Sequence, residues 1–153
     1  MLQRIQSLYL IIVVIALSLM FLFPVANITM STGEIYDFFI YGISSNGNSA
    51  KALSINWTSV AMISILLLNA LVTIFMYRRR LVQVRLTIVN IFMMLGSIFL
   101  LWYNISKQAE VAGADIRYLI PMIIPILCIV LSYLAIRAIG KDEALIRSMD
   151  RIR

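Results

Sequence analysis

Asn69, Asn90 and Cys128 stand inside long apolar runs, and their chemistry is therefore considered first. An amide on an apolar helix both donates and accepts hydrogen bonds, so Asn69 and Asn90 can join neighbouring helices or contact a ligand. Counted at about 1.5 Å per residue from the arginine-rich segment between their runs, the two amides lie within about two turns of the same depth. We expect them to stabilise helix packing, with contact to a ligand as the alternative.

The rest of the sequence excludes most catalytic chemistry. A single cysteine cannot form an intramolecular disulfide, and the absence of histidine removes imidazole as an acid, base or metal ligand. No carboxylate falls within an apolar run, so no proton-relay acid of the kind used by pumps is present. No phosphate-cradling glycine loop is found, nor a nucleophile with a plausible base. The sequence predicts a protein that is not an enzyme and has no cofactor or metal.

The composition is that of a membrane protein. Of 153 residues, 62% are hydrophobic and 13% are charged, against about 25% charged in a typical soluble domain. The mean hydropathy is +0.97, which is more apolar surface than a soluble core of this length can bury. The net charge of +6 is attributed to membrane topology, and no nucleic-acid partner is expected.

Four apolar runs are each long enough, at about 18 to 22 residues, to cross a hydrocarbon core of about 30 Å. The first is too long for the apolar part of a signal peptide and is expected to be an uncleaved anchor. Pro121 and Pro125 should kink or loosen the start of the last run. The predicted spans are residues 8–25, 57–77, 86–103 and 118–139.

A basic turn at residues 78–85 sets the expected orientation. Its arginines are Arg78, Arg79, Arg80 and Arg85. Short loops rich in arginine stay on the cytoplasmic side, where they can also meet anionic headgroups. With this turn inside, ten basic residues are cytoplasmic and three are external. Both termini are therefore predicted to be cytoplasmic.

The two segments outside the spans have distinct patterns. The outer loop, residues 27–56, holds strand-like runs at 27–30 and 35–41 around a glycine-containing turn, which predicts a small extracytoplasmic β-hairpin. The cytoplasmic tail, residues 140–153, has the pattern of a short amphipathic helix released from the last span by Gly140. Its apolar stripe and arginines should contact the membrane surface, a protein partner or the basic turn. The contact residues are Leu145, Ile146, Arg147, Met149, Arg151 and Ile152.

The predicted fold class is therefore an all-α membrane protein: a single domain, a bundle of four transmembrane helices with both termini inside, a small outer hairpin between the first two helices, and a short C-terminal helix. The opening Met1–Leu10 and the ending Arg137–Arg153 resemble an uncharacterised family of Bacteroidota inner-membrane proteins, domain of unknown function 4293. The resemblance covers the whole chain and implies an inner-membrane location, but no reaction.

Two functions remain open. The first is an accessory, assembly or scaffolding subunit that binds a larger membrane complex, or a second copy of itself, within the phospholipid bilayer. The second is a carrier of lipid or a small molecule, with Asn69, Asn90 and the segment around Pro121 and Pro125 lining a polar intramembrane cavity.

Overall fold

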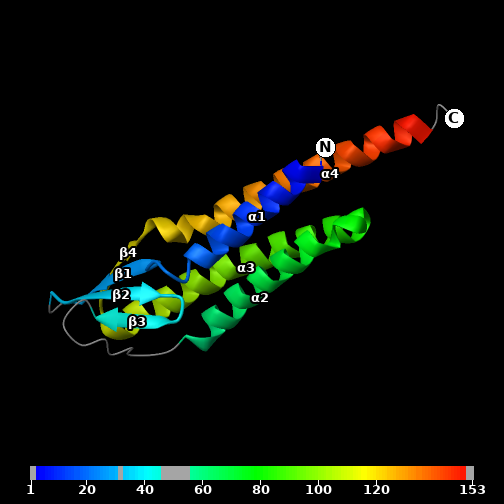
Figure 1. The fold of residues 1–153 in the computed structure, drawn as a ribbon. Helices are drawn as coiled ribbons and strands as arrows, with labels where there is room; N and C mark the ends of the chain where they lie inside the picture. The colour runs from blue at the N-terminus through cyan, green and yellow to red at the C-terminus, as the bar shows by residue number, and fades with distance from the viewer. Residues whose placement is uncertain (1–2, 31–32, 46–55, 151–153) are drawn as a thin grey trace.

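The computed structural model describes residues 3–30, 33–45 and 56–150, with side chains described for 7–30, 33–44, 56–77, 79–110 and 113–141. Four helices run side by side, and a sheet lies at one end of them (Figure 1). The helices are α1 (Gln3–Leu19), α2 (Trp57–Phe75), α3 (Arg80–Ala112) and α4 (Ile124–Asp150), with short 3-10 turns η1 (Met76–Arg78) and η2 (Ile120–Ile123). The strands are β1 (Ala26–Thr29), β2 (Ile35–Phe39), β3 (Gly42–Ser45) and β4 (Asp115–Tyr118).

Buried side chains recur along the helices at alternating steps of four and three residues. This spacing places one stripe of each helix against its neighbours, as in knobs-into-holes packing. On α2 and α3 the stripe comprises Ser59, Ile63, Leu66, Ala70 and Thr73, and Gln83, Thr87, Asn90, Met94, Ser97, Leu101 and Ile105.

The opposite faces of the helices are apolar as well. Phe75 of α2 is 77% exposed and Phe92 of α3 is 69% exposed. A helix that is apolar on all sides is suited to lipid rather than water. Three helical segments are long and apolar enough to cross a membrane: Trp57–Phe75, Arg80–Glu110 and Ile120–Lys141.

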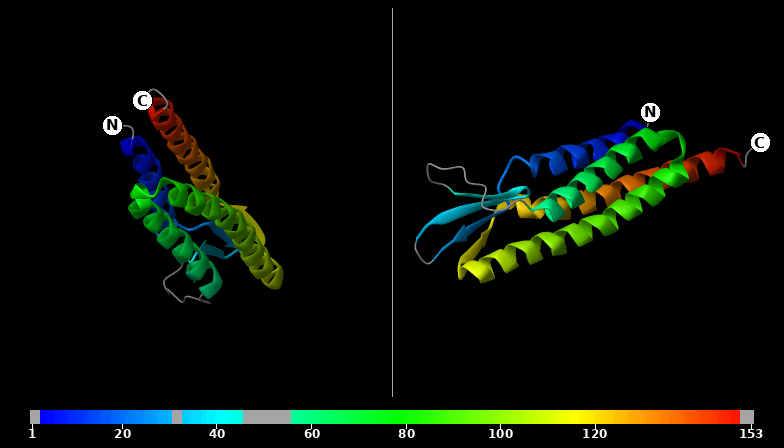
Figure 2. Two further views of the ribbon diagram at one scale, coloured as in Figure 1. Left: turned by 90° about the vertical axis from the view of Figure 1, so that its right-hand side faces the viewer. Right: turned by 90° about the horizontal axis from the view of Figure 1, so that it is seen from below.

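The sheet is antiparallel throughout, with strand order β3-β2-β1-β4. Ala26 of β1 pairs with Phe38 on one side and with Tyr118 on the other. Ile28 and Phe38 point inward and join one hydrophobic core with side chains of the helices, including Leu17 and Ile63. The sheet therefore closes one end of the bundle, as the right-hand view of Figure 2 shows.

The predicted fold class is wrong in three respects. The outer hairpin is only half of the sheet, since β3 and β4 extend it to four strands. The first helix ends at Leu19, and the chain then turns through Pro24 toward β1. Its apolar part is therefore shorter than the apolar parts of the other three helices. The separate C-terminal helix is absent as well, because α4 continues through Gly140 to Asp150.

The expected loop between the third and fourth spans is also replaced by regular structure. Residues 104–112 contain no helix breaker, so α3 continues to Ala112 and ends at Gly113, which has the left-handed φ of 58°. The chain then pairs with β1 as β4. Pro121 and Pro125 lie within η2 and the first turn of α4, where a missing backbone donor costs little, and not within a kinked helix.

Gly113 and Gly140 should respond in opposite directions to substitution by alanine. Gly113→Ala forces a side chain into the left-handed region and should lower the free energy of unfolding by about 1 kcal/mol. Gly140→Ala places a methyl group in open space within α4 and should raise helix stability by up to about 1 kcal/mol. Thermal unfolding of the purified variants in detergent measures both effects. Equal shifts for the two variants would contradict the assigned backbone conformations.

Candidate functional site

The basic turn lies at the end of the bundle opposite the sheet, close to the start of α1 and on the same side as the C-terminal part of α4 (Figure 1). Arg79 and Arg85 are exposed to solvent. Arg80 is half-buried, and its Nη1 is enclosed without a hydrogen-bond partner among the described residues. Arg78 ends η1, and its side chain lies outside the described set. The topology thus places one strongly basic surface at this end.

Most of the tail residues predicted to make contacts lie on α4, where their backbone is described. Residues Leu145, Ile146, Arg147 and Met149 lie on the continuous helix, but their side chains are outside the described set. Arg151 and Ile152 lie outside the described residues altogether. Their predicted contact with lipid or a partner stays a prediction.

Asn69 and Asn90 are both turned into the bundle, but no hydrogen bond joins them among the described residues. The amide nitrogen of Asn69 donates to the carbonyl of Leu86 on α3 at 3.4 Å, linking α2 to α3. Asn90 is 1% exposed, and its Oδ1 is buried without a partner in the described part of the chain. The Asn69 side chain therefore contacts α3, whereas Asn90 has an acceptor without a partner among the described residues.

Asn90 belongs to a buried polar stripe that the sequence reading missed. The hydroxyls of Thr73 and Thr87 donate hydrogen bonds to the backbone carbonyls of Asn69 and Gln83, at 2.7 and 2.8 Å. Ser132 of α4 is fully buried, and its hydroxyl has no partner among the described residues. The signal was present in the spacing of the polar residues at 83, 87, 90 and 97, which recur in steps of four, three and seven.

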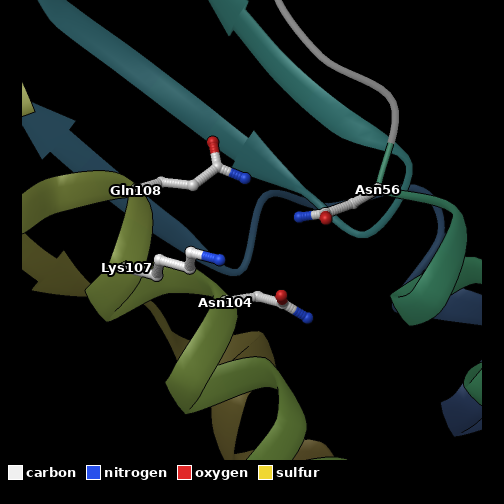
Figure 3. A pocket seen from close by; sticks show the side chains of 4 residues that line it. All are labelled: Asn56, Asn104, Lys107 and Gln108. Atoms are coloured by element: carbon white, nitrogen blue, oxygen red, sulfur yellow. The ribbon is translucent and has the colours of Figure 1, made fainter. Parts of the chain in front are cut away.

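A polar pocket lies at the sheet end, between the start of α2 and the C-terminal part of α3 (Figure 3). Its volume is about 330 Å³, and it opens to the surface. The described side chains that line it are Asn56, Asn104, Lys107 and Gln108. Asn104, Lys107 and Gln108 follow the i, i+3, i+4 spacing of one helix face, so they share a side only because α3 extends beyond its predicted end.

The pocket is rich in hydrogen-bond donors. The Nδ2 of Asn104 donates to Ser59 Oγ at 3.2 Å, which fixes this amide. The Nδ2 of Asn56 is buried and has no partner in the described part of the chain. The terminal nitrogens of Asn56, Lys107 and Gln108 face the same space in Figure 3. Asn104, Lys107 and Gln108 fall between the predicted spans 86–103 and 118–139, so the sequence does not predict their shared helix face.

The outer face of the sheet carries a row of polar side chains. With its amide nitrogen toward the carboxylate, Asn27 donates to Asp37 Oδ1 at 3.1 Å, and Arg117 is the neighbour of Asn27 on β4. At the rim, the Tyr36 hydroxyl donates to Glu34 Oε2 at 2.6 Å, and this hydrogen bond raises the pKa of Tyr36 above its usual 10.0. Among the described residues, no group of three or more acidic, cysteine or histidine side chains is placed to hold a metal ion.

These features define a class of protein: a small helical protein with three helices of membrane-spanning length and an antiparallel sheet across one end of the bundle. Within that class, the chain belongs to the family described as domain of unknown function (DUF4293), whose model matches residues 2–152. This confirms the family resemblance found in the sequence. No match was found among curated proteins or among solved structures.

Proposed function

We propose that the protein is a non-catalytic integral protein of the bacterial inner membrane and serves as an accessory, assembly or scaffolding subunit of a larger membrane complex. The observation that carries the proposal is the sheet. Its strands come from two separate segments, one between α1 and α2 and one between α3 and α4, and its inner face shares a core with the helices. Within the described residues, β3 and β4 are each paired on one side only. A rigid extramembrane platform with unpaired strand edges is suited to binding another chain.

The proposed orientation places the basic end in the cytoplasm and the sheet on the outer side. Its support is the charge distribution: exposed Arg79 and Arg85 flank the connection between α2 and α3, at the end opposite the sheet, where cationic groups remain during insertion. The start of α1 and the C-terminal part of α4 share this end.

Cysteine labelling should reveal this orientation directly. Asp115→Cys on β4 and Lys141→Cys on α4 introduce thiols at exposed positions of the two ends. In intact cells, an impermeant maleimide added from outside, under conditions that admit it to the periplasm, should modify the first and spare the second until the inner membrane is opened. Cys128 is fully buried, so the parent protein should give little background. Labelling in the reverse order would overturn the orientation.

Site-specific photocrosslinking tests the accessory role. A photoreactive residue at Ser44 of β3 or Arg117 of β4 samples the outer face of the sheet in the native host. Each should yield one defined heavier adduct, identified by mass spectrometry after extraction in mild detergent. The same probe at Phe92, which points outward from the middle of α3, is the matched control for contacts through the membrane. A protein that extracts as a free monomer without an adduct at either strand would contradict the role.

A second function is favoured by one observation. Asn90 Oδ1 and Ser132 Oγ are buried polar atoms without partners among the described residues, and a polar ligand between the helices would satisfy both. A carrier of lipid or a small molecule would retain such a ligand through purification. Mass spectrometry of the native protein should then find a bound molecule that Asn90→Leu removes, and a protein without one would exclude the carrier.

A further inference from the structure

We propose that the pocket formed by Asn56, Asn104, Lys107 and Gln108 binds a phosphate group, of the kind that a phospholipid headgroup presents at the sheet-side surface of the membrane. The inference is independent of the accessory role proposed above and shares with it only the membrane placement. It rests on the donor chemistry of the pocket, on its charge and on its depth relative to the helices.

The donors of the pocket have the pattern of an anion site. Lys107 supplies a full positive charge, and Gln108 and Asn56 supply neutral N–H groups on two sides of the same space (Figure 3). The Nδ2 of Asn56 is enclosed without a partner among the described residues, which is costly unless a ligand or water accepts from it. Charged and amide donors converging on one space suit a group with several acceptor oxygens.

The start of α2 adds to the positive potential of the pocket. Asn56 is the N-cap of α2, its side chain makes no capping hydrogen bond, and the first turn contains no acidic residue. The backbone N–H groups of a first turn carry a partial positive charge, which favours an anion nearby. This contribution supports the site but does not define it, since Lys107 provides the principal charge.

No described acidic group neutralises Lys107. Glu110 lies one turn further along α3, at the i+3 position, but no ion pair joins it to Lys107 in the described part of the chain. The Lys107 side chain is exposed, and the pocket is open at the surface. The ammonium group is therefore accessible to an external anion.

The depth of the pocket indicates the source of the phosphate. Arg85 and Asn104 are separated along α3 by 104 − 85 = 19 residues, or about 30 Å, which matches the hydrocarbon thickness of a bilayer. Trp57 beside Asn56, and Trp102 and Tyr103 beside Asn104, are all exposed. Exposed aromatic residues at a helix end mark the headgroup level, where lipid phosphates are concentrated.

Binding measurements on the full-length protein in detergent test the site. The probes are a short-chain phosphatidylglycerol, which carries a phosphodiester, a neutral diacylglycerol of the same chain length, and inorganic phosphate. Phosphatidylglycerol should bind and diacylglycerol should bind more weakly by about tenfold or more, since it lacks the charged acceptor. Lys107→Gln removes the charge at nearly constant size and should weaken phosphatidylglycerol binding about tenfold.

Arg117→Gln is the matched control, because it removes an exposed cation at the same end of the protein but outside the pocket. It should leave phosphatidylglycerol binding unchanged. Equal loss in both variants, or unchanged binding in Lys107→Gln, would overturn the site. If inorganic phosphate binds with the same dependence on Lys107 while the lipid does not bind, the ligand is a free phosphate and the lipid source is wrong. Unchanged thermal midpoints of both variants show that the fold is retained.

Discussion

Replacing Phe38 with alanine is expected to lower the free energy of unfolding by about 3–5 kcal/mol, the range for removing a fully buried aromatic side chain. Phe38 is 0% exposed and lies where the sheet meets the helices. It pairs with Ala26 and Ile43 on the neighbouring strands, and its carbonyl accepts from Val25 N at 2.7 Å. Truncation leaves a cavity that the two elements cannot both close. The sheet should consequently loosen from the bundle.

The loss of stability in Phe38→Ala should be large because the inner face of the sheet is buried away from water. The sheet lies outside the apolar stretch of the helices, so burial of its inner face is driven by the hydrophobic effect, which contributes little between helices in lipid. Phe39→Ala is the matched control, because Phe39 is the next residue, faces the other side and is only half-buried, stacked on Tyr41 at 5.1 Å. Its loss should cost about 1 kcal/mol. Unfolding in detergent, followed by protease cleavage within the sheet, compares the two variants.

If Phe38→Ala and Phe39→Ala were equally mild, the sheet would not share a core with the helices. If only Phe38→Ala accelerates cleavage of the sheet while the helices remain protected, the sheet and the bundle unfold as separate cooperative units. In either case the result reports on the platform to which the accessory role is assigned, and a sheet detached in this way should also lose the adducts expected at Ser44 and Arg117.

The helices could be located from the sequence because each depends on local composition. The predicted span at 57–77 is close to α2, and the strand-like runs at 27–30 and 35–41 are close to β1 and β2. Apolar length does not predict how far a helix continues beyond its apolar stretch, so the span predicted to end at residue 103 continues as α3 to Ala112. The pocket was missed for this reason, since Lys107 and Gln108 lie on the extension.

The fourth strand could not be read from local pattern alone. β4 has only four residues, and its partner β1 lies far away in the sequence, with Ala26 opposite Tyr118. Short strands of this kind are specified by their partner and by the core that they cover, since Ile116 packs against the shared core. The buried polar stripe is different, because the polar residues of α3 share their spacing with buried apolar residues such as Met94, and this shared spacing is present in the sequence.

Placing a carboxyl group at position 90 should be the most damaging single change within the bundle. Asn90→Asp replaces the amide of a side chain on α3 that is 1% exposed with a carboxyl group of nearly the same size. A charged side chain near the middle of a membrane helix costs about 3 kcal/mol on insertion scales. Burial disfavours the charged form of the introduced carboxyl, so its ionisation is less favourable in the folded state than in the unfolded state.

The penalty of Asn90→Asp should therefore depend on pH with a defined sign. Below about pH 4 the carboxyl is neutral in both states and the variant should be nearly as stable as the parent. As the pH rises, the unfolded state ionises first, and stability should fall by about 1.4 kcal/mol per pH unit until the folded-state pKa is reached. The penalty should be constant once the carboxyl is ionised in both states.

The pH dependence separates a buried charge from a packing defect. The parent chain contains no histidine, so no histidine titrates across this pH range. The pH profile of the parent's stability can be subtracted from that of the variant. Asn90→Leu is the second variant: it removes the unpartnered Oδ1 at nearly the same volume and should be neutral or stabilising by about 1 kcal/mol at every pH. A penalty for Asn90→Asp that is equal at pH 4 and pH 7 would indicate a packing defect, whereas no penalty at either pH would show that position 90 is hydrated and would favour a polar cavity between the helices over a closed bundle.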